Sequence, residues 1–308
     1  MSRLLAVDWG SSSLRGALLD DEGTVLDSRS SARGMLAVAK GSFADAFEST
    51  FGDWMDAEPT VCLIAGMAGS RQGWLEAPYC SCPAGLEELA AALVPIPDFS
   101  TRGWSIALVP GLSHMSRDVP DVMRGEETQI MGALRLLGVQ DARVVLPGTH
   151  SKWATVQARR VVGFETFMSG EFFALLRQHS ILKHSVADAE TRPDWPAFDA
   201  GIDRAREAAC LLRSAFSVRT LSLFGVHSPD ASLSYLSGLV IGEELRCQAL
   251  RHDQPVVVVG AAALTERYQR ALSRSGVSVT ALDAPAAWSG LRAIHDRSFA
   301  MGTAHEHD

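Results

Sequence analysis

The sequence of 308 residues predicts an α/β fold built twice, as two related domains. Two segments, near residues 3–28 and 142–167, share one order of strand, glycine-containing turn, strand, turn and strand. Each is followed by alternating helical and strand patterns, which are typical of a layered α/β fold with helices flanking a sheet. The chain length also fits two domains of roughly 150 residues each.

In the first half, apolar runs bounded by turn residues predict strands over 3–8, 14–19, 24–28 and 60–65. Ser42 is a typical N-cap residue. Phe43, Phe47 and Trp54 follow it at helical spacing, which predicts a helix with one apolar face. The last strand runs into a glycine-rich segment, where a turn is expected.

In the second half, the same pattern predicts strands over 142–146, 152–157, 161–167, 255–259 and 277–281. A long helix is expected after Ser228 because Pro229 suits the first helical position. Two further helices are expected over 262–274 and about 284–298. We place the first domain over 1–138 and the second over 139–308, with the final helix able to pack back on the first domain.

Composition excludes several classes of protein. Apolar residues make up 47% of the chain, and 28 basic against 36 acidic residues give a net charge of −8. An acidic chain without a basic run argues against nucleic acid or an anionic membrane as partner. The longest apolar run, 256–264, is far short of the roughly 18 residues that a membrane helix needs. Five cysteines without zinc-type spacing favour reduced thiols and a cytoplasmic enzyme.

The first candidate site follows the first strand. Gly10 permits a tight turn, and the amides and hydroxyls of Ser11, Ser12 and Ser13 can bind phosphate oxygens. Asp8, at the end of the strand, can hold Mg²⁺, usually through water. A single turn of this kind is more often a plain polar hairpin.

A second turn in the other half-chain repeats these residue types. Gly148 corresponds to the first glycine, Thr149 and Ser151 supply hydroxyls at matching positions, and His150 and Lys152 add charge. No acid stands opposite the aspartate of the first turn. Two such hairpins can grip one polyphosphate, so the pair predicts phosphate binding with a single metal anchor.

Two acids stand at the start of an apolar helical segment. Glu126 and Glu127 precede the run 130–137, where the helix macrodipole stabilises negative charge. A carboxylate here can also accept the proton of a hydroxyl group during phosphoryl transfer. The two explanations are compatible, and both residues stay candidates for the base.

A polar loop after strand 60–65 is a candidate for substrate binding. Arg71 can fork onto a carboxylate, and Ser70 and Gln72 can bind hydroxyl groups. Trp74 can wall off the face of a sugar. The equally weighted alternative is a polar surface loop with a buried Trp74.

Gly260 and Ala261 follow the buried strand 256–259 and begin a helix. Small residues there allow adenosine to approach the helix N-terminus, although, for this segment taken alone, close helix–strand packing is the favoured explanation. The dinucleotide-binding fingerprint and the Walker loop are both absent from the sequence, which disfavours a Rossmann dehydrogenase and a P-loop enzyme.

These motifs together resemble the actin/hexokinase/Hsp70 ATPase superfamily, whose members have two ribonuclease H-like domains. The resemblance to the 2-dehydro-3-deoxygalactonokinases within it is more specific. It is carried by five blocks in order, at residues 6–20, 66–79, 123–134, 146–156 and 223–246.

The resemblance implies transfer of the γ-phosphoryl group of ATP to the 6-hydroxyl of 2-dehydro-3-deoxy-D-galactonate, in galactonate breakdown. It implies that Asp8 organises Mg²⁺, that both hairpins hold phosphates, that Gly260 and Ala261 border adenosine, and that Arg71 binds the sugar-acid carboxylate. The alternatives are a kinase for another sugar acid, such as 2-dehydro-3-deoxygluconate, or a non-catalytic ATP-binding switch. The sequence is compatible with a homodimer.

Overall fold

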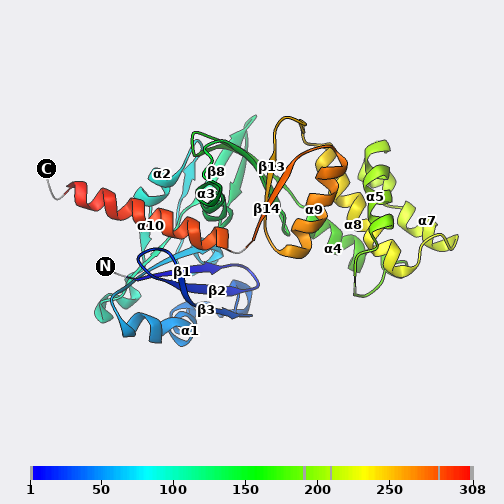
Figure 1. The fold of residues 1–308 in the computed structure, drawn as a ribbon. Coiled ribbons are helices and arrows are strands. Elements are labelled where there is room, and N and C mark those ends of the chain that lie inside the picture. The colour runs from blue at the N-terminus through cyan, green and yellow to red at the C-terminus, as the bar shows by residue number, and fades with distance from the viewer. Residues whose placement is uncertain (1–2, 190–191, 209, 284, 306–308) are drawn as a thin grey trace. The chain divides into compact units, whose positions relative to one another are not determined.

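The computed structural model describes residues 3–189, 192–208, 210–283 and 285–305 (Figure 1). Contacts divide the chain into two units. The first comprises Met1–Ala142, Ala154–Glu165 and Leu282–Asp308, and the second comprises Arg143–Trp153 and Thr166–Ala281. The first unit extends beyond the expected boundary at residue 138, because it also includes the hairpin segment Ala154–Glu165 and the final helix. It does so because the Val161 backbone pairs with Ala84 and the final helix packs on helices of that unit.

The main sheet of the first unit has the strand order β3-β2-β1-β4-β7-β6. Its strands are β1 (Arg3–Trp9), β2 (Leu14–Leu19), β3 (Val25–Ser31), β4 (Thr60–Gly66), β6 (Val94–Pro95) and β7 (Ser105–Leu108). β1 pairs antiparallel with β2 and parallel with β4, so its apolar residues are buried. The four strands expected from the first half of the sequence are therefore confirmed, and β5 (Tyr79–Ser81), β8 (Gly111–Ser116) and β9 (Val119–Met123) form a small additional sheet.

The helical segments of the first unit are α1 (Phe43–Ala57), α2 (Leu86–Ala91), α3 (Glu126–Leu137), α10 (Pro285–His305), and the short 3-10 helices η1 (Met35–Ala37), η2 (Met67–Gly69) and η3 (Pro97–Arg102). α1 begins directly after Ser42, as predicted, although the Ser42 side chain makes no capping hydrogen bond. Phe43, Phe47 and Trp54 are all buried in the core of the unit. The apolar face expected for this helix is confirmed.

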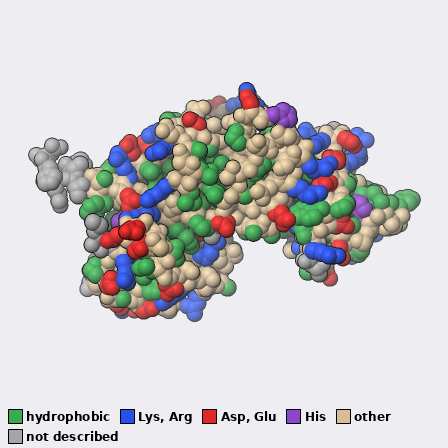
Figure 2. All heavy atoms as spheres, in the orientation of Figure 1, with side chains coloured by type: hydrophobic (Ala, Val, Ile, Leu, Met, Phe, Trp, Pro, Cys, Tyr) green, Lys and Arg blue, Asp and Glu red, His purple; other side chains and the backbone are tan. Residues whose placement is uncertain are grey.

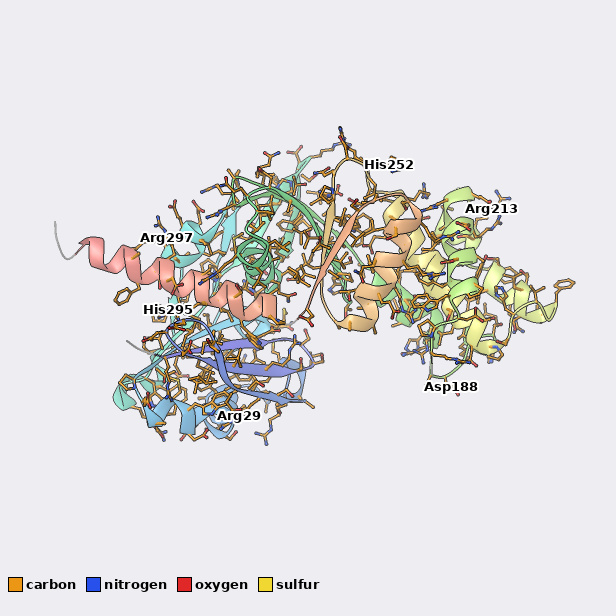
Figure 3. All side chains as sticks on the ribbon, viewed as in Figure 1. Arg29, Asp188, Arg213, His252, His295 and Arg297 are labelled. Atoms are coloured by element: carbon orange, nitrogen blue, oxygen red, sulfur yellow. The ribbon has the colours of Figure 1, made fainter. Side chains whose placement is uncertain are left out.

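α10 lies directly against α3 within the first unit (Figure 1). The contact requires glycine on both helices: a Cβ on Gly132 would stand 1.7 Å from the Ala286 carbonyl oxygen, and one on Gly290 would stand 1.8 Å from that of Thr128. Arg297, labelled in Figure 3, extends from α10 and pairs with a glutamate of α2. α10 therefore supports the helix that carries both candidate acids.

The sheet of the second unit has the order β12-β11-β10-β13-β14. Its strands are β10 (Ala142–Leu146), β11 (Ser151–Gln157), β12 (Arg160–Phe167), β13 (Val256–Val259) and β14 (Val279–Leu282), and the outer parts of β11 and β12 belong to the first unit. Its helices are α4 (Ser169–His179), η4 (Ile181–His184), α5 (Trp195–Glu207), α6 (Leu211–Ser214), α7 (Ser217–Leu223), α8 (Pro229–Arg246) and α9 (Ala262–Arg274). The Ser228 hydroxyl accepts a hydrogen bond from the Ala231 N–H, so the predicted start of the long helix α8 is confirmed.

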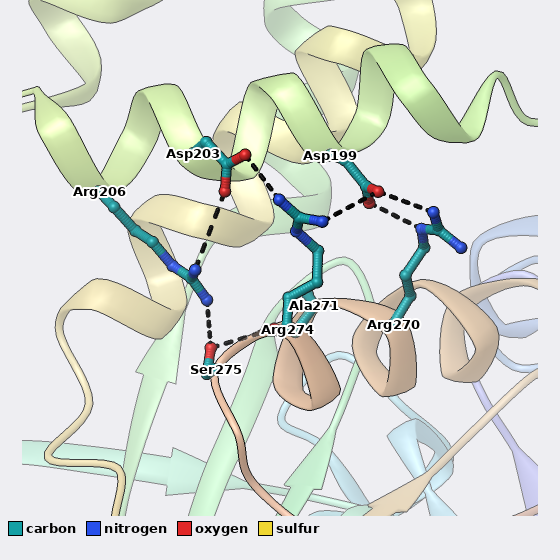
Figure 4. A network of polar contacts seen from close by, with 7 residues as sticks. All are labelled: Asp199, Asp203, Arg206, Arg270, Ala271, Arg274 and Ser275. Carbon is teal, nitrogen blue, oxygen red and sulfur yellow. Dashed lines mark hydrogen bonds and ion pairs between the residues drawn. The ribbon is translucent and has the colours of Figure 1, made fainter.

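A network of ion pairs holds α9 against α5 in the second unit (Figure 4). Arg270 donates two hydrogen bonds of 2.7 Å to Asp199, and Arg274 bridges Asp199 and Asp203 at 3.2 and 2.6 Å. The hydrogen bonds from Arg270 lower the pKa of Asp199. A bidentate network fixes geometry better than isolated surface pairs do, so α9 is held rigidly at its exposed side.

Charged side chains of both signs are interspersed on the face of the molecule drawn in Figure 2. The five cysteines are free thiols, as the sequence predicted. In the parts of the chain that the structure describes, no helix combines the length and apolar character needed to cross a membrane.

Candidate active site

The first glycine-rich hairpin joins β1 to β2. The Gly10 N–H donates to the Ser13 carbonyl oxygen at 2.9 Å and closes the turn, which leaves the side chains of Ser11 and Ser12 exposed. Asp8 precedes the turn with 9% of its surface exposed, and its Oδ2 accepts a 2.6 Å hydrogen bond from Arg15. Burial raises the pKa of Asp8, while the Arg15 charge acts in the opposite direction.

The start of α3 lies beside the ends of β1 and β4. A Cβ on Gly66 would stand 3.3 Å from Asp8 Oδ1 and 2.7 Å from the Trp9 carbonyl oxygen, and one on Gly125 would stand 3.2 Å from the Gly66 Cα. Both glycines have positive φ, 93° and 106°, which other residues rarely adopt. The first unit thus brings Asp8 close to the helix that carries the two candidate bases.

The two neighbouring glutamates have different environments. Glu127 is fully buried, and both of its oxygens accept from the Gly125 N–H, at 2.9 and 2.7 Å. Burial, with a further contribution from the charge of Glu126, raises the pKa of Glu127 to about 8. Glu126 is partly exposed, and its Oε2 accepts from the Arg124 N–H at 2.9 Å. Of the two, Glu126 is the carboxylate that a substrate in solution can reach.

Arg124 joins this helix start to the candidate substrate loop. Its guanidinium is buried, donates to the Ala77 carbonyl oxygen at 2.7 Å and stacks on the Tyr79 ring at 4.3 Å. Its Nη1 lies 3.0 Å from the position of a Cβ on Gly69. Sequence reasoning gave Arg124 no role, because nothing local indicates that it reaches a loop so far away in the chain.

The candidate substrate loop places its polar side chains differently. Arg71 is 87% exposed and makes a single 3.4 Å contact with Glu76, and Gln72 is also exposed. The half-buried Ser70 hydroxyl lies 3.4 Å from the Met35 sulfur. The Trp74 ring packs on Trp9 and on Phe47 in the core, with centroid separations of 6.0 and 5.8 Å, and its Nε1 donates to Asp98 at 2.8 Å. Contacts with core residues therefore cover much of the Trp74 ring.

The second hairpin, between β10 and β11, is exposed at Thr149 and His150. His150 Nε2 lies 2.6 Å from a carboxylate oxygen of Glu171, in the first turn of α4. The last two predicted phosphate ligands are buried instead. The Ser151 hydroxyl donates to Glu244 at 2.8 Å, and Lys152 Nζ donates to the Thr166 hydroxyl at 2.8 Å.

Each hairpin is backed by a glycine from elsewhere in its own unit. A Cβ on Gly34 would stand 2.2 Å from the Ser12 carbonyl carbon, and one on Gly170 would stand 2.3 Å from the Gly148 carbonyl oxygen. Neither glycine was singled out from the sequence. The signal that could have found them is that each half of the sequence has a glycine downstream of the repeated hairpin motif.

A cavity of about 240 Å³ opens next to the second hairpin, within the second unit. Its walls are mostly apolar and come from the hairpin, α4, α8 and α9, with Gly148, Phe173, Ile241 and Leu264 among the lining residues. Arg267 adds a polar group to the wall, where its Nη1 donates to the Ser237 hydroxyl at 2.9 Å. Mostly apolar walls with a few polar groups are typical of sites for small ligands, and they suit an aromatic ring such as that of a nucleoside.

The predicted adenosine segment borders the same hairpin. A Cβ on Gly260 would stand 3.5 Å from the Pro147 carbonyl oxygen, and Ala261 is the exposed residue that precedes α9. Gly260, Ala261 and the second hairpin therefore lie together at the carboxyl ends of β10 and β13, the edge at which open α/β sheets bind ligands.

Comparisons with known proteins agree with this arrangement. Residues 8–294 match the model of the 2-keto-3-deoxy-galactonokinase family. A probable 2-dehydro-3-deoxygalactonokinase of Rhizobium meliloti is 41% identical, with coverage of 91% of this chain and 92% of the relative. The 2-dehydro-3-deoxygalactonokinase of Escherichia coli is 34% identical, with coverage of 95% and 97%.

Solved structures show the same relationship. A crystal structure of a Sinorhizobium meliloti protein assigned as a 2-dehydro-3-deoxygalactonokinase matches with a TM-score of 0.86 at 39% identity, over 96% of this chain and 98% of that chain. A Clostridium difficile dehydratase activator with bound ADPNP shares only the fold, with a TM-score of 0.53 at 11% identity over 98% and 97% of the two chains.

The family defines a carbohydrate kinase, which uses ATP and a sugar acid as substrates. Its fold is that of the actin-like ATPases, so the predicted fold class is confirmed. Within that class, the chain belongs to the 2-keto-3-deoxy-galactonokinase family, and the resemblance seen in the sequence is confirmed.

Gly170→Ala is expected to weaken ATP binding about tenfold or more, because the added methyl group forces the second hairpin away from α4, and overpacking costs about 1–3 kcal/mol. The dissociation constant for ATP, measured by titration calorimetry, checks this result. Gly52→Ala is the control, since a Cβ there meets only side chains of α1 and Trp104. Unchanged ATP affinity in Gly170→Ala would show that the hairpin does not depend on this contact.

Proposed function

We propose that the enzyme transfers the γ-phosphoryl group of ATP to the 6-hydroxyl of 2-dehydro-3-deoxy-D-galactonate, giving the 6-phosphate and ADP, as a step of galactonate breakdown. The observation that carries this proposal is the pair of exposed glycine-rich hairpins, each backed by a glycine, in a chain whose family match spans residues 8–294. Phosphoryl transfer requires positioning and charge stabilisation more than covalent catalysis.

For the nucleotide, we assign adenosine to the cavity lined by α4, α8 and α9. Gly260 and Ala261, which precede α9, are assigned to its border, although they are not among the residues that line the cavity. Each unit has its own candidate phosphate-binding turn, Gly148–His150 in the second unit and Gly10–Ser13 in the first. Ser151 and Lys152 support the second turn from inside the unit, because their polar groups already have partners there.

Asp8 fits the role of a magnesium anchor. In the described parts of the chain, no three His, Cys, Asp or Glu side chains gather into a metal site. Magnesium in kinases is usually held by one or two carboxylates together with phosphates and water, so a single Asp8 is a sufficient protein ligand. When bound, Mg²⁺ neutralises charge on the phosphate oxygens. Until then, Arg15 balances the charge of Asp8.

For the sugar acid, we assign Glu126 as the base that accepts the proton of the 6-hydroxyl, because it is the accessible carboxylate of the pair. Glu127 holds the first turn of α3 through the Gly125 N–H. Arg71, with its exposed guanidinium, binds the substrate carboxylate, and Ser70 and Gln72 are assigned to its hydroxyl groups. The exposed edge of Trp74 bounds the site.

ADP release with Mg-ATP tests the proposal, with 2-dehydro-3-deoxygalactonate, 2-dehydro-3-deoxygluconate, galactonate or no addition. We expect strong stimulation by the first compound alone, since closure of a kinase on its substrate limits hydrolysis by water. Stimulation by one of the other acids would change the substrate and keep the chemistry. Slow release that no sugar acid stimulates would contradict the proposal and favour an ATP-binding switch.

A further inference from the structure

Glu244 of α8 is a buried carboxylate with four hydrogen-bond donors, all within the second unit. Only 1% of its surface is exposed. Its Oε1 accepts from the Ser151 hydroxyl at 2.8 Å and from Trp153 Nε1 at 2.6 Å. Its Oε2 accepts from the Tyr268 hydroxyl at 2.8 Å and from the Ser169 hydroxyl. One side chain thus collects donors from three other elements of the unit.

Burying this carboxylate lowers the stability of the fold unless all of its hydrogen bonds are made. A buried carboxylate loses several kcal/mol of solvation, and only well-placed donors recover that loss. Two donors on each oxygen supply the charge-assisted bonds that a buried anion requires. Burial and the neighbouring charge of Glu244 raise the pKa of Tyr268 well above its ordinary value, which keeps its hydroxyl a donor.

Two of the four donors to Glu244 line the cavity assigned to adenosine. Ser169, the first residue of α4, and Tyr268 of α9 both line it. Ser151 ends the phosphate hairpin whose first residue, Gly148, also lines it. The remaining wall is α8 itself, through residues such as Ile241. A single carboxylate therefore ties together the hairpin and the three helices that surround the cavity.

We propose that Glu244 is a positioning residue for the nucleotide, which holds the second phosphate hairpin in register with α4 and α9 so that the cavity is formed before Mg-ATP binds. The inference rests on the proposed assignment of adenosine to this cavity. It also gives Ser151 a defined role as the link between hairpin and carboxylate, in place of direct contact with phosphate.

Glu244→Gln is the most informative variant, because the orientation of the new amide group can be deduced from its neighbours. Trp153 Nε1 can only donate, so the amide oxygen must face Trp153 and Ser151. The amide NH₂ group then faces the hydroxyls of Ser169 and Tyr268, which can act as acceptors. The substitution removes the charge and reverses two bonds without leaving a cavity, so the fold is expected to persist.

The test measures the Kd of Mg-ATP by calorimetry, together with KM for ATP and for the sugar acid, in wild type and in Glu244→Gln. Kd and KM for ATP should rise about 10- to 100-fold, as for loss of charged hydrogen bonds, while KM for the sugar acid changes less than about twofold. The matched control is Glu243→Gln, one residue away, where the carboxylate pairs with Arg246 at the surface. That control should stay near wild type.

Ser151→Ala and Tyr268→Phe remove one donor each and keep the inference testable if Glu244→Gln folds poorly. Each should raise Kd for Mg-ATP, and combined with Glu244→Gln each should add less than its separate effect, since the three share one network. A lower Tm with unchanged ATP affinity in the folded variants would assign Glu244 a purely structural role and overturn the inference. Equal increases in both KM values would also overturn it.

Calorimetry separates this inference from the proposed function. Wild-type enzyme that binds Mg-ATP while no sugar acid stimulates ADP release would contradict the substrate assignment, and a weaker Kd in Glu244→Gln would still support the inference. Wild-type enzyme that fails to bind Mg-ATP would overturn both.

Discussion

Glu126→Gln is expected to lower kcat by about 10²–10⁴-fold, the usual contribution of a general base, with a much smaller effect on KM for ATP. The amide keeps the length of the side chain and can still accept the Arg124 N–H, but it cannot take the proton of the substrate hydroxyl. ADP release at saturating ATP and sugar acid measures this loss.

Glu127→Gln is the paired variant, because Glu127 is buried and its pKa is raised to about 8. A carboxyl group whose pKa in the folded protein lies above its ordinary value of 4.5 stabilises the fold at low pH, and this contribution is lost as pH rises through about 8. The Tm of the wild type should therefore fall between pH 5 and about 8.5, and the Tm of Glu127→Gln should fall less over the same range. A larger loss of kcat in Glu127→Gln than in Glu126→Gln would exchange the two roles.

Asp8→Asn is expected to lower kcat/KM for ATP by about 10²–10³-fold at fixed magnesium, as for loss of a group that stabilises charge in the transition state. It should also raise the magnesium concentration needed for half-maximal rate, because an amide binds the hydrated ion more weakly than a carboxylate does. Rates measured over a magnesium series distinguish this effect from a general loss of activity.

Asp27→Asn, on the exposed strand β3, is the control for this variant because it removes an acid of the same unit away from the site. Near-normal turnover in Asp8→Asn with an unchanged magnesium dependence would remove Asp8 from the metal role. The role of its carboxylate would then be to pair with Arg15.

Much of the fold could be predicted from the sequence because its signals are local. Turn residues and short apolar runs predicted β1, β2 and β4, and the Ser228 cap predicted the start of α8. The start of α4 was expected near Glu171, and the structure places that residue in the first turn of the helix. The helices between residues 181 and 223 were not predicted. The small sheet β5-β8-β9 was also missed, since β5 has only three residues and lies far from β8 in the sequence.

The candidate site, like the fold, could be predicted from the sequence only in part. The sequence alone determined where the two hairpins lie and which residue types they carry, because a tight turn depends on a few adjacent residues. Only the tertiary structure decided which polar groups face outward. The buried Ser151 donates a hydrogen bond to Glu244, which lies 93 residues away in the sequence. Trp74 packs in the core against Phe47 of α1. Burial and pairing depend on such distant contacts, and local sequence does not encode them.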